Sequence, residues 1–578
     1  MRSATRVRRG HGARTLLRFA AALVAAALPG SAAVAMAQDE SPARPSATAD
    51  RADASGPLAT APDSALAMVL ARLPGEPLAL EDALALALVS DTAVQAAQAR
   101  LQAAEASVRR ERGVFAPELF GEGEYAEERQ PTASFFAGAD VLEIERTRAE
   151  AGARMRLPLG TELSASLNTV RLTTNSSFAT LSPQWDSFGQ LALVQPLLRG
   201  FGPAARSQLG AAERLRDEAE SLYTDVRLTT RADVETTYWA LYAAERDLAV
   251  QTLIREQAEA FLREAQLRAD AGLIGPADVA SARVFLAEQA QAALDLEENL
   301  DVLSDRLAVL MGRRPAGSAW RYRPLSTPPP IDAAIDQESL VRAALARSPQ
   351  ASAAEQSLAA ARTRLRGARW DALPQLDLFG TLGGRGLAGT GREVVIGFGE
   401  GPPDTLRNPL DTGFGDSFDQ VVSRDFPAWS VGLLFSVPIG ASVDRGDRDR
   451  LRAQVTLAEQ QLEAVRRALD SQVRARAREL ERGAARLEFA SEGVDASLEQ
   501  VRAGILQFKS GRTTAFELVR LAADLADAQR RYSAALVRTA AAAAELRRLT
   551  GGAHPAEPQA PASPGPGDHS SVPEEGAP

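Results

Sequence analysis

The side chains that most often carry out chemistry in proteins are nearly absent from this chain. It has 578 residues, no cysteine and three histidines, and the histidines all lie near the two ends, at His11, His554 and His569. The long stretch between them lacks the thiolate nucleophile, the commonest metal ligand and the commonest general base. We therefore expect a protein that is not an enzyme and that uses no metal and no cofactor.

The first residues have the features of an export signal. Six arginines precede the short apolar stretch Phe19–Leu28, and the small residues at 35–37 form a typical cleavage site before Gln38. We expect residues 1–37 to be a signal peptide, with a disordered basic N-terminus as the alternative. No cysteine stands at the cleavage site to carry a lipid. Loss of six of the 65 basic residues widens the excess of the 75 acidic ones, which argues against a nucleic-acid partner.

The remaining chain repeats itself over long distances. Residues 77–119 match residues 337–376 with an offset of 257, and a second set of matches follows with an offset of 239. The matched pairs include Leu101 with Leu358, Pro117 with Pro374, Gly272 with Gly511, and Gly312 with Gly551. Two repeats of this size are too few and too long for a solenoid. They indicate a duplicated half-molecule.

Each half is expected to run helix, strand region, very long helix, turn and helix. The long helices are expected at 203–271 and 442–510, which are rich in the helix formers Ala, Leu, Arg, Glu and Gln. The helices after the turns, 277–311 and 515–550, have apolar residues stepping by three and four, as in a coiled-coil seam. Such a stripe indicates which helices pack together, not what they bind.

This layout gives six segments. They are a signal peptide (1–37), a flexible leader (38–76), a first repeat (77–312), a proline-rich linker (313–336), a second repeat (337–552) and a disordered tail (553–578).

Between the helices lie strand-like stretches, over 118–195 in the first half and 375–437 in the second. The stretches expected to be strands are 118–127, 151–157, 161–173, 188–195, 375–383 and 429–437. Several alternate with a period of two, as when one face meets lipid and the other a lumen. The core of a soluble sandwich is the alternative. The mature chain offers no run of about 20 apolar residues for a spanning helix, so a membrane would have to be crossed by a closed barrel that several chains share.

Taken in order, these features resemble the TolC family of outer-membrane efflux proteins, from about Leu78 to Gly551. The resemblance is carried by the ends of the opening helices, the strand-to-helix transitions and the helix turns. These segments are 117–119 and 374–376, 191–197 and 433–439, and 272–279 and 511–518.

The resemblance implies a mainly α fold with membrane β structure, assembled as a homotrimer. Its strands would form one shared β-barrel in outer-membrane lipid, and its long helices a coiled-coil barrel, or tunnel, through the periplasm. The duct would act passively beside a periplasmic adaptor (a membrane fusion protein) and an inner-membrane pump of the RND or ABC type, in efflux or type I secretion. The alternative is a structural or adaptor-like periplasmic coiled-coil protein without a barrel of its own.

By the same resemblance, the two helix turns lie at the periplasmic entrance and contact the adaptor. The residues that match this site are Gly272, Leu273, Ile274, Asp278, Gly511, Arg512 and Thr513. Glycine suits the positive φ of a helix C-cap, and an acid in the next first turn suits the helix dipole. Trimer symmetry would also turn Asp278 and Glu517 into carboxylate rings that select cations.

Two departures from the family pattern stand out. Arg520 occupies a position, one turn beyond Glu517, where the family often has a second acid, so the ring would carry mixed charge. The first half also has four strand-like stretches where the family pattern leads us to expect two. Either some of them are parts of one bent strand, or the first half carries an extra hairpin.

Overall fold

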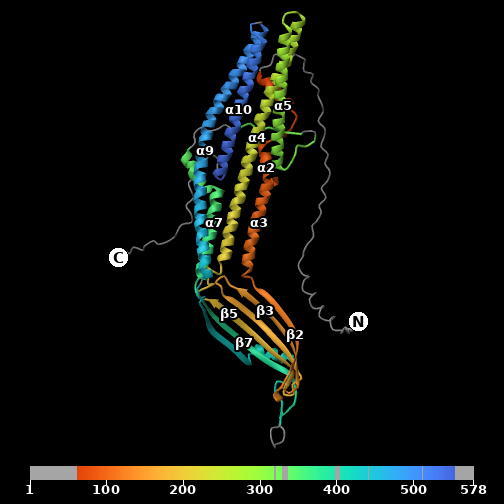
Figure 1. Cartoon of the computed structure of the whole chain (residues 1–578), viewed down its shortest axis with the longest axis vertical. Helices are drawn as coiled ribbons and strands as arrows, with labels where there is room; N and C mark the ends of the chain where they lie inside the picture. Colours follow the sequence, from red (N-terminus) through yellow and green to blue (C-terminus); the bar gives the residue numbers. More distant parts are fainter. Residues whose placement is uncertain are drawn as a thin grey trace, which may run out of the picture. The chain divides into compact units, whose positions relative to one another are not determined.

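The computed structural model describes residues 62–317, 320–328, 336–396, 404–440, 442–510 and 512–552 (Figure 1). Its helices are α1 (Pro62–Arg72), α2 (Leu80–Ser90), α3 (Thr92–Gly113), α4 (Ser207–Asp270), α5 (Pro276–Met311), α6 (Gln337–Arg347), α7 (Pro349–Asp371), α8 (Phe414–Ser423), α9 (Ser442–Lys509) and α10 (Ala515–Leu549), with a 3-10 turn at Phe135–Ala137. Its strands are β1 (Glu76–Leu78), β2 (Glu118–Pro131), β3 (Val141–Arg156), β4 (Glu162–Thr174), β5 (Leu181–Pro196), β6 (Tyr322–Pro324), β7 (Gln375–Gly391), β8 (Val394–Ile396), β9 (Asp404–Leu406) and β10 (Phe426–Ser436).

Among the described residues, the two halves share four helices but differ in their strands. α2, α3, α4 and α5 of the first half have counterparts in α6, α7, α9 and α10 of the second. Four long strands, β2 to β5, lie between α3 and α4, whereas two, β7 and β10, contribute to the same sheet from the second half. The expectation of two strands per half is therefore wrong for the first half, which carries an extra hairpin rather than a bent strand.

These six strands form one antiparallel sheet in the order β10-β7-β5-β4-β3-β2. The register is continuous, with Leu119 opposite Ala153, Ala153 opposite Ala165, and Ala165 opposite Leu191. β5 pairs with β7 and so joins the two halves. Several strands are longer than their alternation predicts. The expected 151–157 is the end of β3, whose first ten residues include charged side chains on both faces and so hide the period of two.

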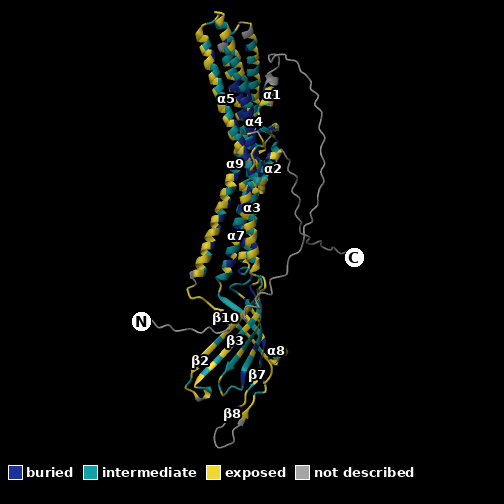
Figure 2. Cartoon of the chain, turned by 90° about the vertical axis from the view of Figure 1, so that its right-hand side faces the viewer, coloured by how far each residue is buried: buried dark blue, intermediate teal, exposed yellow. Residues whose placement is uncertain are grey.

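The helices pack side by side in a layer that follows the same chain order. Nearer the sheet, α3 packs on α4, α4 on α7, and α7 on α9. Nearer the helix turns, α5 and α10 pack on α4, and α10 also packs on α9 (Figure 1). α9 and α10 approach closely at Gly483, where a Cβ would stand 2.6 Å from Thr539 Oγ1. The buried residues, dark blue in Figure 2, gather along the middle of α4.

The helix bounds correct the expected ones by a few residues. The first long helix begins at Ser207 rather than 203, after a series of turns, and the second runs from Ser442 to Lys509. α1 lies inside 38–76, where we expected only a flexible leader, and β1 begins at the last residue of that segment. β6 lies inside the expected linker 313–336. β1 and β6 pair in parallel, and β6 packs on α4. The expected signal peptide and the expected tail 553–578 lie outside the described residues.

The β1–β6 pair is held to the helix layer by one buried tyrosine. The Tyr238 hydroxyl donates to the carbonyl of Leu78 at 2.9 Å. It accepts from the backbone N–H groups of Leu325 and Ser326 at 3.0 and 2.9 Å. Its ring is fully buried in the core between α4, α5 and α2. One hydroxyl thus binds three backbone groups. Leu325 N–H also donates to the Leu78 carbonyl at 3.0 Å, so Ser326 N–H is the group that depends on Tyr238 for its partner.

Tyr238→Phe is expected to lower the thermal transition of the purified protein. The variant keeps the packing of the ring but removes the partner of Ser326 N–H, at a cost of about 1–3 kcal/mol if that group stays buried. Leu325 N–H and the Leu78 carbonyl remain paired with each other. The transition is followed by circular dichroism in detergent. Tyr223→Phe, on the same helix but half-exposed, is the control and should leave the midpoint unchanged. Equal midpoints for both variants would contradict the role given to Tyr238.

Candidate functional site: the helix turns and the two faces of the sheet

The α4–α5 turn and the α9–α10 turn lie at the same end of the helix layer, away from the sheet (Figure 1). α4 alone contributes 64 residues between the sheet and the first turn, or roughly 96 Å of helix at 1.5 Å per residue. The structure therefore brings together the two segments, more than 230 residues apart in sequence, that the resemblance assigned to the entrance.

The α4–α5 turn is closed by glycine and by an acidic cap. Gly272 has a φ of +72°, as a helix C-cap requires, and Leu273 N–H donates to the carbonyl of Arg268 at 2.9 Å. The Asp278 carboxylate accepts from Gly275 N–H at 3.1 Å. Leu273 is 74% exposed, while Ile274 is half-buried. Asp278 thus caps the helix, and an apolar side chain projects from the tip.

The α9–α10 turn is also closed by a helix cap, but a threonine hydroxyl takes the place of the carboxylate. Arg512 N–H donates to the carbonyl of Gln507 at 2.9 Å, and the Thr514 hydroxyl caps α10 by accepting from Glu517 N–H at 3.4 Å. The Glu517 carboxylate takes no part in this cap and is exposed, as is Arg520. Thr513 is half-buried, and Gly511 lies outside the described residues. The second turn therefore leaves its acid available to the solvent, whereas the first uses its acid as a cap.

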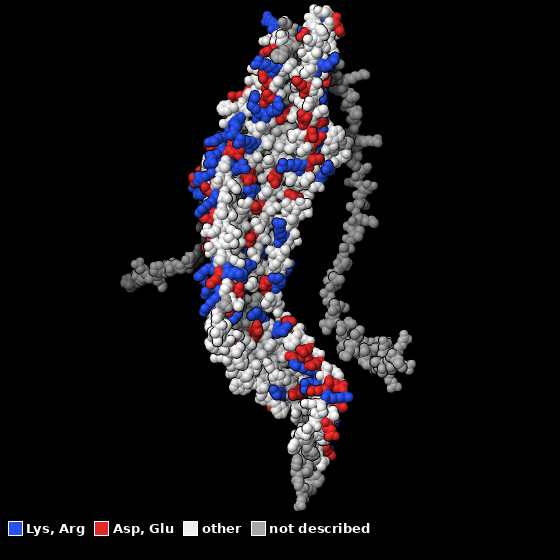
Figure 3. Space-filling view, viewed as in Figure 1, with Lys and Arg blue, Asp and Glu red and all other residues white. Residues whose placement is uncertain are grey.

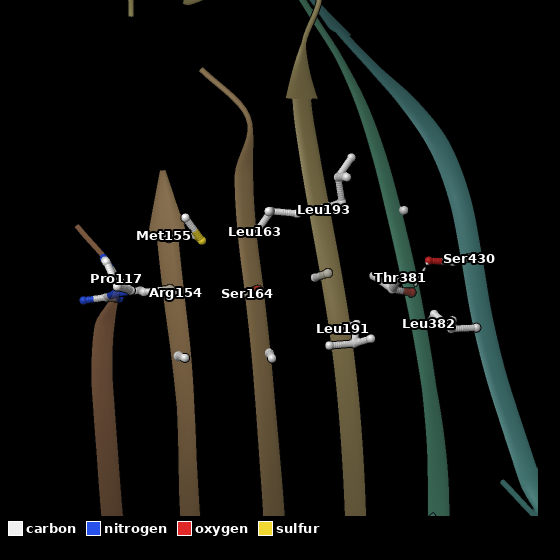
Figure 4. A pocket seen from close by; sticks show the side chains of 14 residues that line it. Pro117, Arg154, Met155, Leu163, Ser164, Leu191, Leu193, Thr381, Leu382 and Ser430 are labelled. Atoms are coloured by element: carbon white, nitrogen blue, oxygen red, sulfur yellow. Dashed lines mark hydrogen bonds between the residues drawn. The ribbon is translucent and has the colours of Figure 1, made fainter. Parts of the chain in front are cut away.

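Over the part nearer the helices, one face of the sheet is apolar across all six strands. Farther from the helices the same face carries Glu127 and Arg129 of β2 and Glu143 and Glu145 of β3. The residues that share this face in register include Leu119 and Tyr125 of β2, Ala153 and Met155 of β3, Leu163 and Leu167 of β4, Leu191 and Leu193 of β5, Leu382 of β7, and Trp429, Val431, Leu433 and Phe435 of β10. Many of them are exposed, with Leu119 at 84% and Trp429 at 74%. Figure 4 shows a shallow groove of about 640 Å³ on this face, lined by leucines of β4, β5 and β7. A sheet face of this kind needs an apolar environment.

A short amphipathic helix covers one end of this apolar face. α8 lies against β7 and β5, where Gly384 and Gly386 allow its backbone to approach the sheet. The Ser417 and Ser187 hydroxyls are 2.9 Å apart, and the rings of Phe414 and Trp185 are in contact with centroids 6.0 Å apart.

The other face of the sheet is polar, most strongly on β2 and β3. It carries Glu118, Glu122 and Glu124 of β2 and Arg148, Glu150 and Arg154 of β3, by the same register. Arg154 donates twice to the Glu118 carboxylate, at 2.8 and 3.0 Å. Figure 3 shows charged side chains gathered on the β2 side of the sheet, and a mainly white surface over β5 and β7. The sheet is therefore built to separate water from an apolar medium.

Two acids on α4, the buried Glu245 and the half-buried Asp247, were missed by sequence reasoning. Burial raises the pKa of Glu245 to about 7 against the attraction of Arg323, whose Nε lies 3.5 Å from Glu245 Oε1. Burial also raises the pKa of Asp247 to about 6, although it accepts from the Ser533 hydroxyl of α10 at 2.5 Å. Asp247 thus lies in the contact between the two halves. The sequence gives no signal for it, because acids are common along both long helices.

The described helices contain no stretch long and apolar enough to cross a bilayer. A family model described as "Outer membrane efflux protein" matches residues 83–313 and 340–552, one match for each half. The chain belongs to the outer membrane efflux protein family. This finding confirms the resemblance to TolC and the duplication. The family is one of outer-membrane channels rather than enzymes.

Solved channels of outer membranes share the fold of this family member. The outer-membrane channel OprN matches with 20% identity and a TM-score of 0.57, over 82% of this chain and 90% of that one. The CmeC channel of Campylobacter jejuni matches with 14% identity and a TM-score of 0.58, over 83% and 87%. VceC of Vibrio cholerae matches with 14% identity and a TM-score of 0.55, over 82% and 96%. No curated protein matches the chain.

Asp247→Asn is expected to remove part of the pH dependence of stability in this efflux family member. Because the folded-state pKa is raised to about 6 from 3.8, the wild type loses stability as pH rises through that window and changes no further above it. Asparagine keeps an acceptor for Ser533 and carries no charge.

The variant should therefore gain thermal stability over the wild type at about pH 8 and much less at about pH 4.5. The exposed Asp524→Asn on α10 is the control, and its difference from the wild type should be the same at both pH values. A gain for Asp247→Asn that is equal at both values would contradict the assignment.

Proposed function

We propose that this protein is the exit duct of a tripartite efflux or type I secretion system. In this proposal it is exported with removal of residues 1–37, is not lipidated, and lies in the outer membrane with its helices extending into the periplasm. It conducts substrates passively, and an inner-membrane pump of the RND or ABC type supplies the energy. The observation that carries the proposal is the two-faced sheet. It joins an apolar face to a charged one and stands at the end of a layer of very long helices.

The duct is proposed to be a homotrimer. Both layers of the chain end at the same two edges, since β2 follows α3 directly and α9 follows β10 directly. A single chain therefore supplies one sector of a tunnel wall, and copies must complete it. A coiled-coil adaptor without a barrel is disfavoured by the long two-faced sheet, for which such a protein would have no use.

The two helix turns are proposed to meet the periplasmic adaptor. The exposed Leu273 provides an apolar contact at one tip and Arg512 a charged one at the other, while Gly272, Ile274, Asp278 and Thr513 shape the turns. Gly511 is proposed for the same contact from its place in the sequence. Within this proposal Glu517 and Arg520 form the ring that faces ions. Asp278 contributes less, because its carboxylate is already engaged in capping α5.

Membrane fractionation tests the proposed duct. The full-length protein should be recovered in the outer-membrane fraction and should run as a trimer after extraction in mild detergent. Its mass in the detergent complex is measured by light scattering or native mass spectrometry. Recovery as a soluble monomer in the periplasmic fraction would contradict both the location and the assembly.

Glu517→Ala is expected to lower the preference of the reconstituted channel for cations, because three carboxylates leave the mouth together. The measurement is the reversal potential in a planar bilayer under a KCl gradient. Arg520→Ala, one helical turn away, is the matched variant and should shift the potential in the opposite direction. Permeability ratios that stay unchanged in both variants would contradict the proposed role of Glu517 and Arg520 in ion selectivity.

A further inference from the structure

The sheet has two open edges, and both are long. β2 at one edge runs for 14 residues and β10 at the other for 11, and each pairs with one neighbour only within the part of the chain that the structure describes. Their outward side chains are exposed, including Leu119, Tyr125 and Val431. An open strand edge of this length needs a partner strand, above all in lipid.

All four strands of the first half, including the central β3 and β4, belong to the sheet, and none lies in a loop above it. β3 has 16 residues and β4 has 13, whereas about 9–11 residues cross the apolar layer of a membrane when a strand is tilted. The two strands are paired with their neighbours along nearly their whole length. Their face shared with Leu191 carries Ala151, Ala153 and Met155. They thus continue the apolar band that the other strands form.

The strand directions allow the two edges to meet. β2 leads away from the helices and β3 returns, and the alternation continues through β10, which leads back to α9. β2 and β10 therefore run in opposite directions. When β10 of one copy lies beside β2 of the next, the new pair is antiparallel like every other pair in the sheet, and the ring closes without a break in the pattern.

We infer that three copies close an eighteen-stranded barrel by pairing β10 of each chain with β2 of the next. This inference rests on the proposed trimeric duct, and it goes beyond it by fixing the strand count and the contact between copies. The partner at each edge is a second copy of this chain. Two strands per half would give twelve strands, so the extra hairpin widens the barrel by half.

The strand count sets the width of the exit. With strands about 4.8 Å apart and tilted by about 40°, eighteen strands give a backbone diameter of roughly 36 Å, against roughly 24 Å for twelve. Three copies of the layer α3, α4, α7 and α9 give twelve helices, which span roughly 96–120 Å of circumference at 8–10 Å each. Eighteen strands span roughly 113 Å. The two rings therefore match in size where they join.

Disulfide trapping tests the proposed contact between β10 of one copy and β2 of the next. Because the chain has no cysteine of its own, only the introduced cysteines can form a disulfide. Val431→Cys on β10 is combined, one at a time, with cysteine at Leu119, Gly121, Gly123 or Tyr125, which share the outward face of β2. A matched series places the second cysteine at Leu163, Ala165, Leu167 or Thr169 on the same face of β4. Within one chain both series are several strand spacings of about 4.8 Å from β10, too far for a disulfide.

The oxidised full-length protein is read in native outer membranes by non-reducing denaturing gels. The inference expects a covalent trimer from one β2 position, with weaker products at its neighbours and none from the β4 series. Trimer from the β4 series instead would overturn the eighteen-stranded barrel and leave the trimeric duct standing. No covalent product from either series, in a protein that light scattering shows to be trimeric, would also overturn it. If light scattering showed a monomer, the proposed function as a trimeric duct would itself be contradicted.

Discussion

The need to pair every backbone hydrogen-bonding group away from water is the constraint on which the rest of this structure depends. A helix satisfies its own groups, but a strand does so only with a neighbour. The sheet has neighbours for β3, β4, β5 and β7 and one side each of β2 and β10 left open. The helix layer ends along the same two edges, at α3 and α9. The proposed assembly from identical copies would therefore complete both layers at once.

Duplication supplied this architecture, and the copies have since become unequal in two places. The helices correspond one to one, which keeps the packing of the layer regular. The strands do not correspond, since the first half has four in the shared sheet and the second has two. The turns also differ, because Asp278 caps one helix with its carboxylate whereas Thr514 caps the other and leaves Glu517 exposed. In the proposed duct, both differences lie at the two ends and not along the wall.

Sequence reasoning reached the helices and the turns more fully than the sheet. The long helices are rich in helix-forming residues, so their bounds at Ser207–Asp270 and Ser442–Lys509 are close to those expected. Most of β3 was missed, because Glu143, Glu145 and Arg146 obscure the alternation of polar and apolar residues along it. The ion pair of Glu143 with Arg129 joins β3 to β2, and a pairing between two strands cannot be seen in the sequence of either strand. The parallel pairing of β1 with β6 had no local signal at all, because its two strands are three residues long and about 245 residues apart.

By itself the sequence determined the family and the duplication, and it predicted the two helix turns and an exported chain that is not an enzyme. These properties follow from the composition, from the spacing of particular residues and from the periodicity of apolar residues, all of which can be read along the chain. The tertiary structure alone decided that six strands share one sheet, that its two open edges run in opposite directions, and that Asp278 is engaged where Glu517 is not. Those properties depend on which distant segments come into contact. A hydrogen bond between the backbones of two strands does not depend on the side chains of either strand, so the sequence does not reveal it.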